Sequence, residues 1–152
     1  MNKQEIKKFT VFVIDDDVEF CKLLRALVGH TIFTSKLPGY DVVLVTHSDM
    51  QKIADAIKYI KVEKPDLILL DYMLGPAADS CLESLDLLKE IVPCSSDIRL
   101  LTGMHLEDIR LEAVKKFLVD AHLELISKPF GAEILVDIIK KSIRKKENVK
   151  CN

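Results

Sequence analysis

The sequence predicts an α/β domain built on a doubly wound parallel sheet with helices on both faces. Short, unbroken apolar runs occur five times along the 152 residues. Such runs are typical of strands that are buried on both faces of a parallel sheet. Amphipathic stretches with helical spacing alternate with them. A repeated β-α order favours a single sheet with right-handed crossovers, and function is then expected at the carboxyl ends of the strands.

Five apolar runs bounded by polar residues are predicted to be the strands. None of them is long enough for an ordinary helix, and none shows the strict alternation of a strand with one solvated face. The five predicted strands are Thr10–Ile14, Asp41–Thr46, Asp66–Leu70, Ile98–Thr102 and Leu123–Ser127.

Helices are predicted between and after these runs, because apolar residues recur there every three or four positions. A shorter helix over Leu85–Val92 is expected to stop before Pro93, since proline cannot continue a helix. The other four predicted helices carry the apolar stripes Phe20, Cys21, Leu24, Leu27 and Val28; Met50, Ile53, Ala54, Ile57 and Ile60; Leu106, Ile109, Ala113, Phe117 and Leu118; and Ile134, Leu135, Ile138, Ile139, Ser142 and Ile143.

Two segments are too long for simple connections. Gly29–Tyr40 precedes the second predicted strand and contains the turn signal Pro38-Gly39, and Tyr72–Ser84 follows the third predicted strand. Connections of this length are usually functional or mobile. We expect the first to lie far from any site at the carboxyl ends of the strands.

The composition predicts one globular domain over residues 1–152, with a core over about 9–146 and no output domain. The 22 basic and 24 acidic residues nearly balance, so no overall positive field indicates a nucleic-acid partner. No apolar run approaches the length of about 18 residues that a membrane helix needs. The four cysteines lack metal-binding spacing and are interpreted as reduced thiols, so we expect a cytoplasmic protein.

Polar residues follow or end four of the five predicted strands. Crowded carboxylates raise one another's pKa, and Mg²⁺, which prefers hard oxygen ligands, relieves that repulsion. A nearby ammonium and hydroxyl complete a set suited to phosphoryl transfer, in which an aspartate can be the nucleophile. In chain order the residues are Asp15-Asp16-Asp17, Asp71, Thr102-Gly103 and Ser127-Lys128-Pro129-Phe130.

Each of these motifs alone also fits a structural role. Asp15–Asp17 can be an acidic cap before a helix, and we assign Asp17 to that cap. Asp71 alone fits a turn after a strand. The functional interpretation therefore rests on all four motifs together, in an order that brings neighbouring strands to one crevice.

Taken together, the motifs resemble those of the receiver domains of two-component response regulators. The resemblance covers nearly the whole chain and implies a flavodoxin-like sheet with strand order 2-1-3-4-5. Since no output domain is predicted, we expect a stand-alone receiver that acts through its surface, or a receiver cut from a longer protein. The matching segments are Val11–Asp17 (VFVIDDD), Pro65–Leu74 (PDLILLDYML), Leu100–Gly103 (LLTG) and Ile126–Phe130 (ISKPF).

The resemblance implies that Asp71 is the phosphoacceptor. The phosphoryl group would come from a phosphohistidine on a histidine kinase or a histidine phosphotransfer protein. Asp15, Asp16, Asp71 and the backbone carbonyl of Met73 would hold Mg²⁺. The protein would not be an enzyme toward free metabolites, because it would catalyse only its own phosphorylation and dephosphorylation.

The same resemblance assigns phosphoryl-binding positions to Thr102, Gly103 and Lys128 and places a cis peptide bond before Pro129. Thr102 is expected to shift toward the phosphoryl group. In the family, an aromatic ring three positions before the lysine turns inward with that shift. Here that switch position is Leu125, which has no ring, so conventional signal transmission is in doubt while phosphorylation is not.

The segment after Asp71 also departs from the family pattern. Leu87 and Leu88 come sixteen and seventeen positions after Asp71, several more than usual, and Gly75-Pro76 reverses the usual order. Met73 and Met104 are expected to flank the phosphoryl pocket and shield it from water, which predicts slow loss of the phosphoryl group. The candidate output-face positions are Leu106, Arg110 and Lys115.

Two alternatives remain open at this stage. The first is an interaction module that keeps the receiver fold and acts without phosphorylation, which Leu125 and the altered segment favour. The second, less favoured, is a Mg²⁺-dependent phosphohydrolase with Asp71 as nucleophile. Such enzymes often need a second acid shortly after the nucleophile, and the residue two positions on is Met73, a poor general acid.

Overall fold

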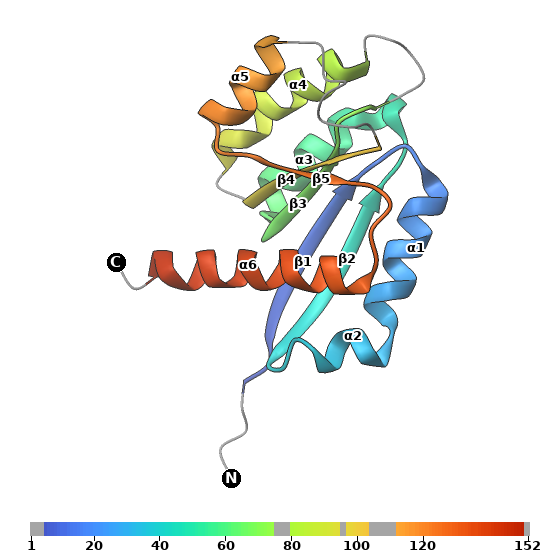
Figure 1. Ribbon diagram of the computed structural model, residues 1–152, viewed down its shortest axis with the longest axis vertical. Helices are drawn as coiled ribbons and strands as arrows, with labels where there is room; N and C mark the ends of the chain where they lie inside the picture. The colour runs from blue at the N-terminus through green and yellow to red at the C-terminus, as the bar shows by residue number, and fades with distance from the viewer. Residues whose placement is uncertain (1–4, 75–79, 95–96, 104–111, 151–152) are drawn as a thin grey trace.

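A computed structural model describes residues 5–74, 80–94, 97–103 and 112–150. Its five strands form one parallel sheet in the order β2-β1-β3-β4-β5, which confirms the predicted order (Figure 1). Each predicted strand is present, with boundaries that differ by at most three residues. The strands are β1 (Lys7–Ile14), β2 (Tyr40–His47), β3 (Leu67–Asp71), β4 (Asp97–Thr102) and β5 (Glu124–Ser127).

Helices cover both faces of the sheet, as the doubly wound class requires (Figure 1). The packing of buried side chains places α1, α2 and α6 on one face and α3, α4 and α5 on the other. The short 3₁₀ turn η1 precedes α3, and a second one, η2, follows α4. The bounds are α1 (Val18–Gly29), α2 (Thr31–Ser35), η1 (Met50–Lys52), α3 (Ile53–Glu63), α4 (Ser80–Ile91), η2 (Val92–Cys94), α5 (Glu112–Asp120) and α6 (Ala132–Lys150).

The central strands are buried on both faces, which explains their unbroken apolar runs. All five residues of β3 and all six residues of β4 are buried, whereas β2 and β5 at the sheet edges are only partly covered. Along β1, Val11 and Val13 pack toward α1 and α6, while Phe12 and Ile14 pack toward α3 and α4. This alternation divides the core into two layers and leaves the strand ends free to carry polar groups.

The segment Gly29–Tyr40 is part of the core, contrary to the expectation of a functional or mobile connection. It contains α2, and its side chains Phe33 and Leu37 are 1% and 3% exposed. The segment lies at the amino end of β1, where the Lys7 amide donates to the carbonyl of Gly39 at 2.9 Å. It is therefore at the opposite end of the sheet from the carboxyl ends of the strands, as predicted.

Two predicted core positions are wrong. Ala54 is exposed, and Ala56, which lies three residues after Ile53 and four before Ile60 on the inward helix face, is buried instead. Ile134 is 48% exposed, since Leu135 and Val136 occupy the inward face of the first turn of α6.

The connection after β3 is shorter than predicted, because α4 begins at Ser80 rather than Leu85. The predicted stripe residues Leu106 and Ile109 lie outside the described residues. Within the described ranges, no helix combines the length and the apolar character needed to cross a membrane. The described cysteines Cys21 and Cys94 are free thiols, as interpreted from their spacing.

The burial of α2 makes a first prediction. Phe33→Ala should lower the free energy of unfolding by about 3 kcal/mol, because it empties a ring-sized volume in the core. Ile134→Ala is the matched control and should lower the free energy of unfolding by less than about 1 kcal/mol, because Ile134 is exposed even though the sequence pattern predicts a core position. Urea denaturation measures both. Equal costs for the two variants would contradict the placement of α2 in the core.

Candidate functional site

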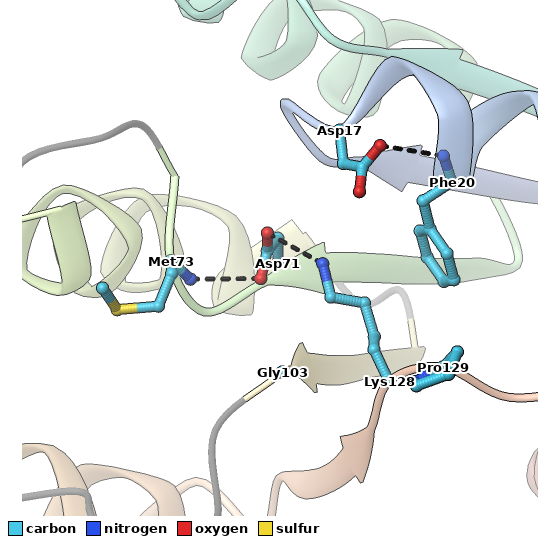
Figure 2. Close-up of a pocket in the computed structure, with 7 residues that line it drawn as sticks. All are labelled: Asp17, Phe20, Asp71, Met73, Gly103, Lys128 and Pro129. Carbon is cyan, nitrogen blue, oxygen red and sulfur yellow. Dashed lines mark hydrogen bonds and ion pairs between the residues drawn. The ribbon is translucent and has the colours of Figure 1, made fainter.

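Two carboxylates and an ammonium group meet at the carboxyl ends of the strands. Asp15 directly follows β1, Asp71 ends β3, and Lys128 directly follows β5. The Nζ atom of Lys128 lies 2.9 Å from Oδ2 of Asp15 and 3.0 Å from Oδ2 of Asp71, and Figure 2 shows the second of these two ion pairs. The Asp15 side chain is fully buried, and those of Asp71 and Lys128 are 7% and 15% exposed. The geometry of a parallel sheet thus brings together residues from both ends of the chain.

Backbone groups fix the first of these carboxylates. The Asp15 amide donates to the carbonyl of His47 at 3.1 Å, which continues the pairing of β1 with β2 beyond the strand end. Oδ1 of Asp15 accepts the amide of Asp17 at 2.9 Å. Asp17 in turn caps α1, because its Oδ1 accepts the amide of Phe20 at 3.0 Å (Figure 2). This confirms the cap role predicted for Asp17.

The second carboxylate is held in the turn that leaves β3. Oδ1 of Asp71 accepts a hydrogen bond from the amide of Met73 at 3.1 Å (Figure 2). The Tyr72 amide donates to the carbonyl of Leu101 at 2.7 Å. The hydroxyl of Ser84 donates to the backbone carbonyl of Asp71 at 3.1 Å, and the Ser84 side chain is fully buried. Sequence reasoning missed Ser84, because it assigned this residue to the end of a loop rather than to α4.

Burial and mutual repulsion act on the titration of this cluster. Burial and then the negative charge of Asp15 raise the pKa of Asp71 to about 6, although the ammonium of Lys128 and the amide of Met73 act in the opposite direction. For Lys128, burial lowers the pKa, but its hydrogen bonds and charge interactions with Asp15 and Asp71 outweigh burial and raise the pKa. One ammonium therefore does not compensate the two buried carboxylates.

Asp16 adds a third carboxylate, and the three acids fit a cation. One oxygen from each of Asp15, Asp16 and Asp71 lies within 4.8 Å of the others, with Asp16 half-buried. Carboxylate oxygens at this separation are the donors that a hard divalent cation prefers. Burial and the charge of Asp15 raise the pKa of Asp71, and a cation beside the three carboxylates would favour its ionised form. Charge and donor chemistry thus both fit a divalent ion.

A pocket of about 480 Å³ opens in front of Asp71. A Cβ added at Gly103 would meet no atom within 4 Å, so packing does not require glycine there and the open space extends to its backbone. The Lys128–Pro129 peptide bond is cis. The pocket is lined by Asp17, Phe20, Asp71, Met73, Gly103, Lys128 and Pro129 (Figure 2).

Thr102 and Leu125, the two residues expected to take part in switching, lie on neighbouring strands and differ in burial. Thr102 is fully buried at the last position of β4, and its backbone carbonyl accepts the amide of Lys128 at 2.6 Å. Leu125 is half-buried in β5, packs against the core layer on the α3 and α4 side, and is not among the residues that line the pocket. The structure therefore brings Asp15, Asp71 and Lys128 together and places the switch position Leu125 in the core layer.

Several predicted positions are only partly described. Met73 is half-buried and lines the pocket, as expected of a flanking residue. Met104, Leu106 and Arg110 lie outside the described residues, and Lys115 lies in α5.

The fold is found in known signalling proteins. No protein-family model matches the sequence, and no curated protein has a significantly similar sequence. A response regulator from Colwellia psychrerythraea is 18% identical with a TM-score of 0.53, over 90% of this chain and 98% of that one. A signal receiver domain of two-component signal transduction (histidine kinase) from Clostridium thermocellum is 16% identical with a TM-score of 0.58. That match covers 88% of this chain and 96% of the other. The chain therefore has the receiver fold of two-component systems, as its motifs indicate.

The charge imbalance predicts a stabilising substitution. The pKa of Asp71 is raised from its ordinary value of 3.8 to about 6 in the folded protein. Between these two pH values the folded protein keeps a proton on Asp71 that the unfolded chain has released. The metal-free protein should therefore lose stability as the pH rises through this window. Asp71→Asn removes the charge and should be more stable than wild type at pH 7, by about 1–3 kcal/mol, but not at pH 4.

Thermal and urea denaturation in the presence of a chelator measure this difference. Asp86→Asn, which removes a highly exposed carboxylate on α4, is the control and should show no such pH dependence. Added Mg²⁺ should stabilise wild type and have a much smaller effect on Asp71→Asn. A stability difference between wild type and Asp71→Asn that stays constant from pH 4 to pH 7 would contradict the assigned charge balance.

Proposed function

We propose that this protein is a cytoplasmic response-regulator receiver that accepts a phosphoryl group on Asp71 in a Mg²⁺-dependent reaction. The donor is a phosphohistidine of a histidine kinase or a histidine phosphotransfer protein. One observation carries the proposal: Lys128 bridges Asp15 and Asp71 at the open end of a receiver fold, beside a third carboxylate from Asp16. The receiver fold of the two similar structures supports it.

The reaction needs a nucleophile that is held still and exposed to the donor. A carboxylate oxygen of Asp71 forms the new bond to phosphorus while the bond from phosphorus to the histidine nitrogen breaks, and that nitrogen keeps the electron pair. The amide of Met73 and the hydroxyl of Ser84 hold Asp71 from two sides. The pocket in front of Asp71 admits the donor, with Gly103 leaving its wall open.

Charge compensation is the second requirement, because the transferring group is negative. Asp15, Asp16, Asp71 and the backbone carbonyl of Met73 are the groups that would hold Mg²⁺. When bound there, the ion would offset the negative charge of the carboxylates and of the phosphoryl oxygens. Lys128 supplies a further positive charge, and Thr102 is the residue proposed to hydrogen-bond the phosphoryl group.

The proposed output is a change in a protein-interaction surface. Phosphorylation turns the Asp71 carboxylate into a mixed anhydride, so Lys128 loses one of its two carboxylate partners and gains phosphoryl oxygens. The same residue is tied through its amide to the carbonyl of Thr102, so the ends of β4 and β5 respond together. We propose no action on free metabolites, since the chemistry is confined to the protein's own aspartate.

Intact mass after incubation with acetyl phosphate and Mg²⁺ tests the proposal. Wild type should gain one phosphoryl adduct, and Asp71→Asn and a chelator-treated sample should gain none. The control Asp137→Asn, an exposed position on α6, should be labelled like wild type. If the folded wild type gains no adduct at any time and does not hydrolyse the donor, the protein is instead a phosphorylation-independent interaction module. Sustained turnover of a phosphomonoester would indicate a phosphohydrolase.

The apolar neighbour of Asp71 predicts a long-lived phosphoryl group. Met73 lines the pocket two positions after Asp71 and offers water no strong hydrogen-bonding group. The adduct on wild type should therefore persist for minutes or longer. Met73→Asn, which provides an amide that can orient an attacking water, should shorten its lifetime by about tenfold, or about 1.4 kcal/mol of activation free energy. The decay of the adduct, followed by mass after donor removal, measures both; a wild-type lifetime of seconds contradicts the prediction.

A further inference from the structure

The ring of Phe20 contacts the ammonium group of Lys128. Nζ of Lys128 lies 5.0 Å from the centroid of the Phe20 ring. Phe20 is 8% exposed and lines the pocket in front of Asp71 (Figure 2). At this distance a lysine ammonium is attracted to the electron-rich face of an aromatic ring, and the attraction is stronger where water is excluded.

The ring is held in place from two directions. The amide of Phe20 donates to Oδ1 of Asp17, which fixes the first turn of α1. The ring itself meets Phe130 edge to face, with centroids 5.5 Å apart and an interplanar angle of 84°. Phe130 comes two residues after Lys128, so one aromatic pair joins the start of α1 to the segment that carries the ammonium group. The helical stripe predicts only that Phe20 faces the core.

We propose that Phe20 is a positioning residue that confines the ammonium group of Lys128 to the pocket and thereby increases the rate of phosphoryl transfer to Asp71. This inference rests on the proposed function. The four-carbon stem of lysine is flexible, and an ammonium group gains hydration by turning toward solvent. The two carboxylates hold Lys128 from one side, and the ring of Phe20 provides a further attractive contact.

The contact matters most when the carboxylates are engaged elsewhere. As the Asp71 oxygen bonds to phosphorus, its attraction for the ammonium group weakens, and a bound divalent ion competes for Asp15. The ring of Phe20 does not take part in either interaction and keeps its attraction throughout. Lys128 therefore stays beside the transferring group at the stage where its charge is most useful.

The kinetic test compares four proteins with acetyl phosphate and Mg²⁺ over a range of donor concentrations. Phe20→Leu keeps an apolar side chain but removes the ring, and should lower the rate at saturating donor by about 3- to 30-fold. Phe20→Tyr keeps the ring and should stay within about twofold of wild type. Phe9→Leu is the matched control: Phe9 is 1% exposed in the same core layer, at the far end of β1, and this variant should also stay within about twofold.

The kinetic results distinguish a positioning role of Phe20 from a role in the pocket wall and from a general loss of packing. If Phe20→Leu raises only the KM for the donor and keeps the saturating rate, Phe20 is a wall of the donor pocket and the inference is overturned. If Phe9→Leu slows the reaction as much as Phe20→Leu, the effect is general loss of packing and the inference is again overturned. If wild type itself gains no adduct, the proposed function fails, which is a separate result.

Nuclear magnetic resonance tests the contact without any phosphoryl transfer. The methylene hydrogens next to Nζ of Lys128 should show an upfield ring-current shift in wild type and in Phe20→Tyr. The shift should disappear in Phe20→Leu, and an unchanged shift in that variant overturns the inference. The same spectra show whether each variant is folded. Phe20→Met, which has a long apolar side chain and no ring, serves both tests if the leucine variant does not fold.

Discussion

The ammonium group of Lys128 joins the ends of three strands of the sheet. It follows β5 and reaches Asp15 after β1 and Asp71 at the end of β3. Because it is largely buried, it cannot regain full hydration, and each ion pair offsets part of the free energy lost on burial. Removing the lysine would leave two buried carboxylates without the partner that they share. Lys128 therefore ties together strand ends that parallel pairing has already brought to one edge of the sheet.

The same cluster explains why the site needs further positive charge. Asp15, Asp16 and Asp71 bring three carboxylates to a space where Lys128 is the ammonium group that contacts two of them. The pKa of Asp71 rises to about 6 as a result, chiefly through burial and then through Asp15. Under the proposed function, a divalent ion would offset the negative charge of these carboxylates, since such an ion can take oxygen ligands from the protein and from an incoming group. The closeness of the three carboxylates is what supports this proposal.

The resemblance of the motifs to receiver domains predicted the sheet order, and parallel topology explains why the polar residues at the strand ends meet at one edge. The prediction of core residues failed where spacing alone does not decide the packing. Ala54 and Ala56 both border the apolar stripe of α3 and only Ala56 is buried, and the short helix α2 has too few residues to show a periodicity that would place Phe33 in the core. The contact of Phe20 with Lys128 depends on how α1 packs beside the end of β5, which no local pattern contains.

The absence of an aromatic ring at position 125 does not isolate the pocket from the rest of the sheet. Leu125 packs into the layer beneath α3 and α4, so it does not contact the charged groups directly. A different connection is present in the backbone, where the Lys128 amide donates to the carbonyl of Thr102 at 2.6 Å. Under the proposed function, a displacement of the end of β4 would be passed to the backbone that carries the ammonium group, and the contacts of Phe20 with Phe130 and Lys128 would limit it. A change in charge at Asp71 would then reach the edge strand β5 by a hydrogen bond and an aromatic pair, and neither involves the side chain at position 125.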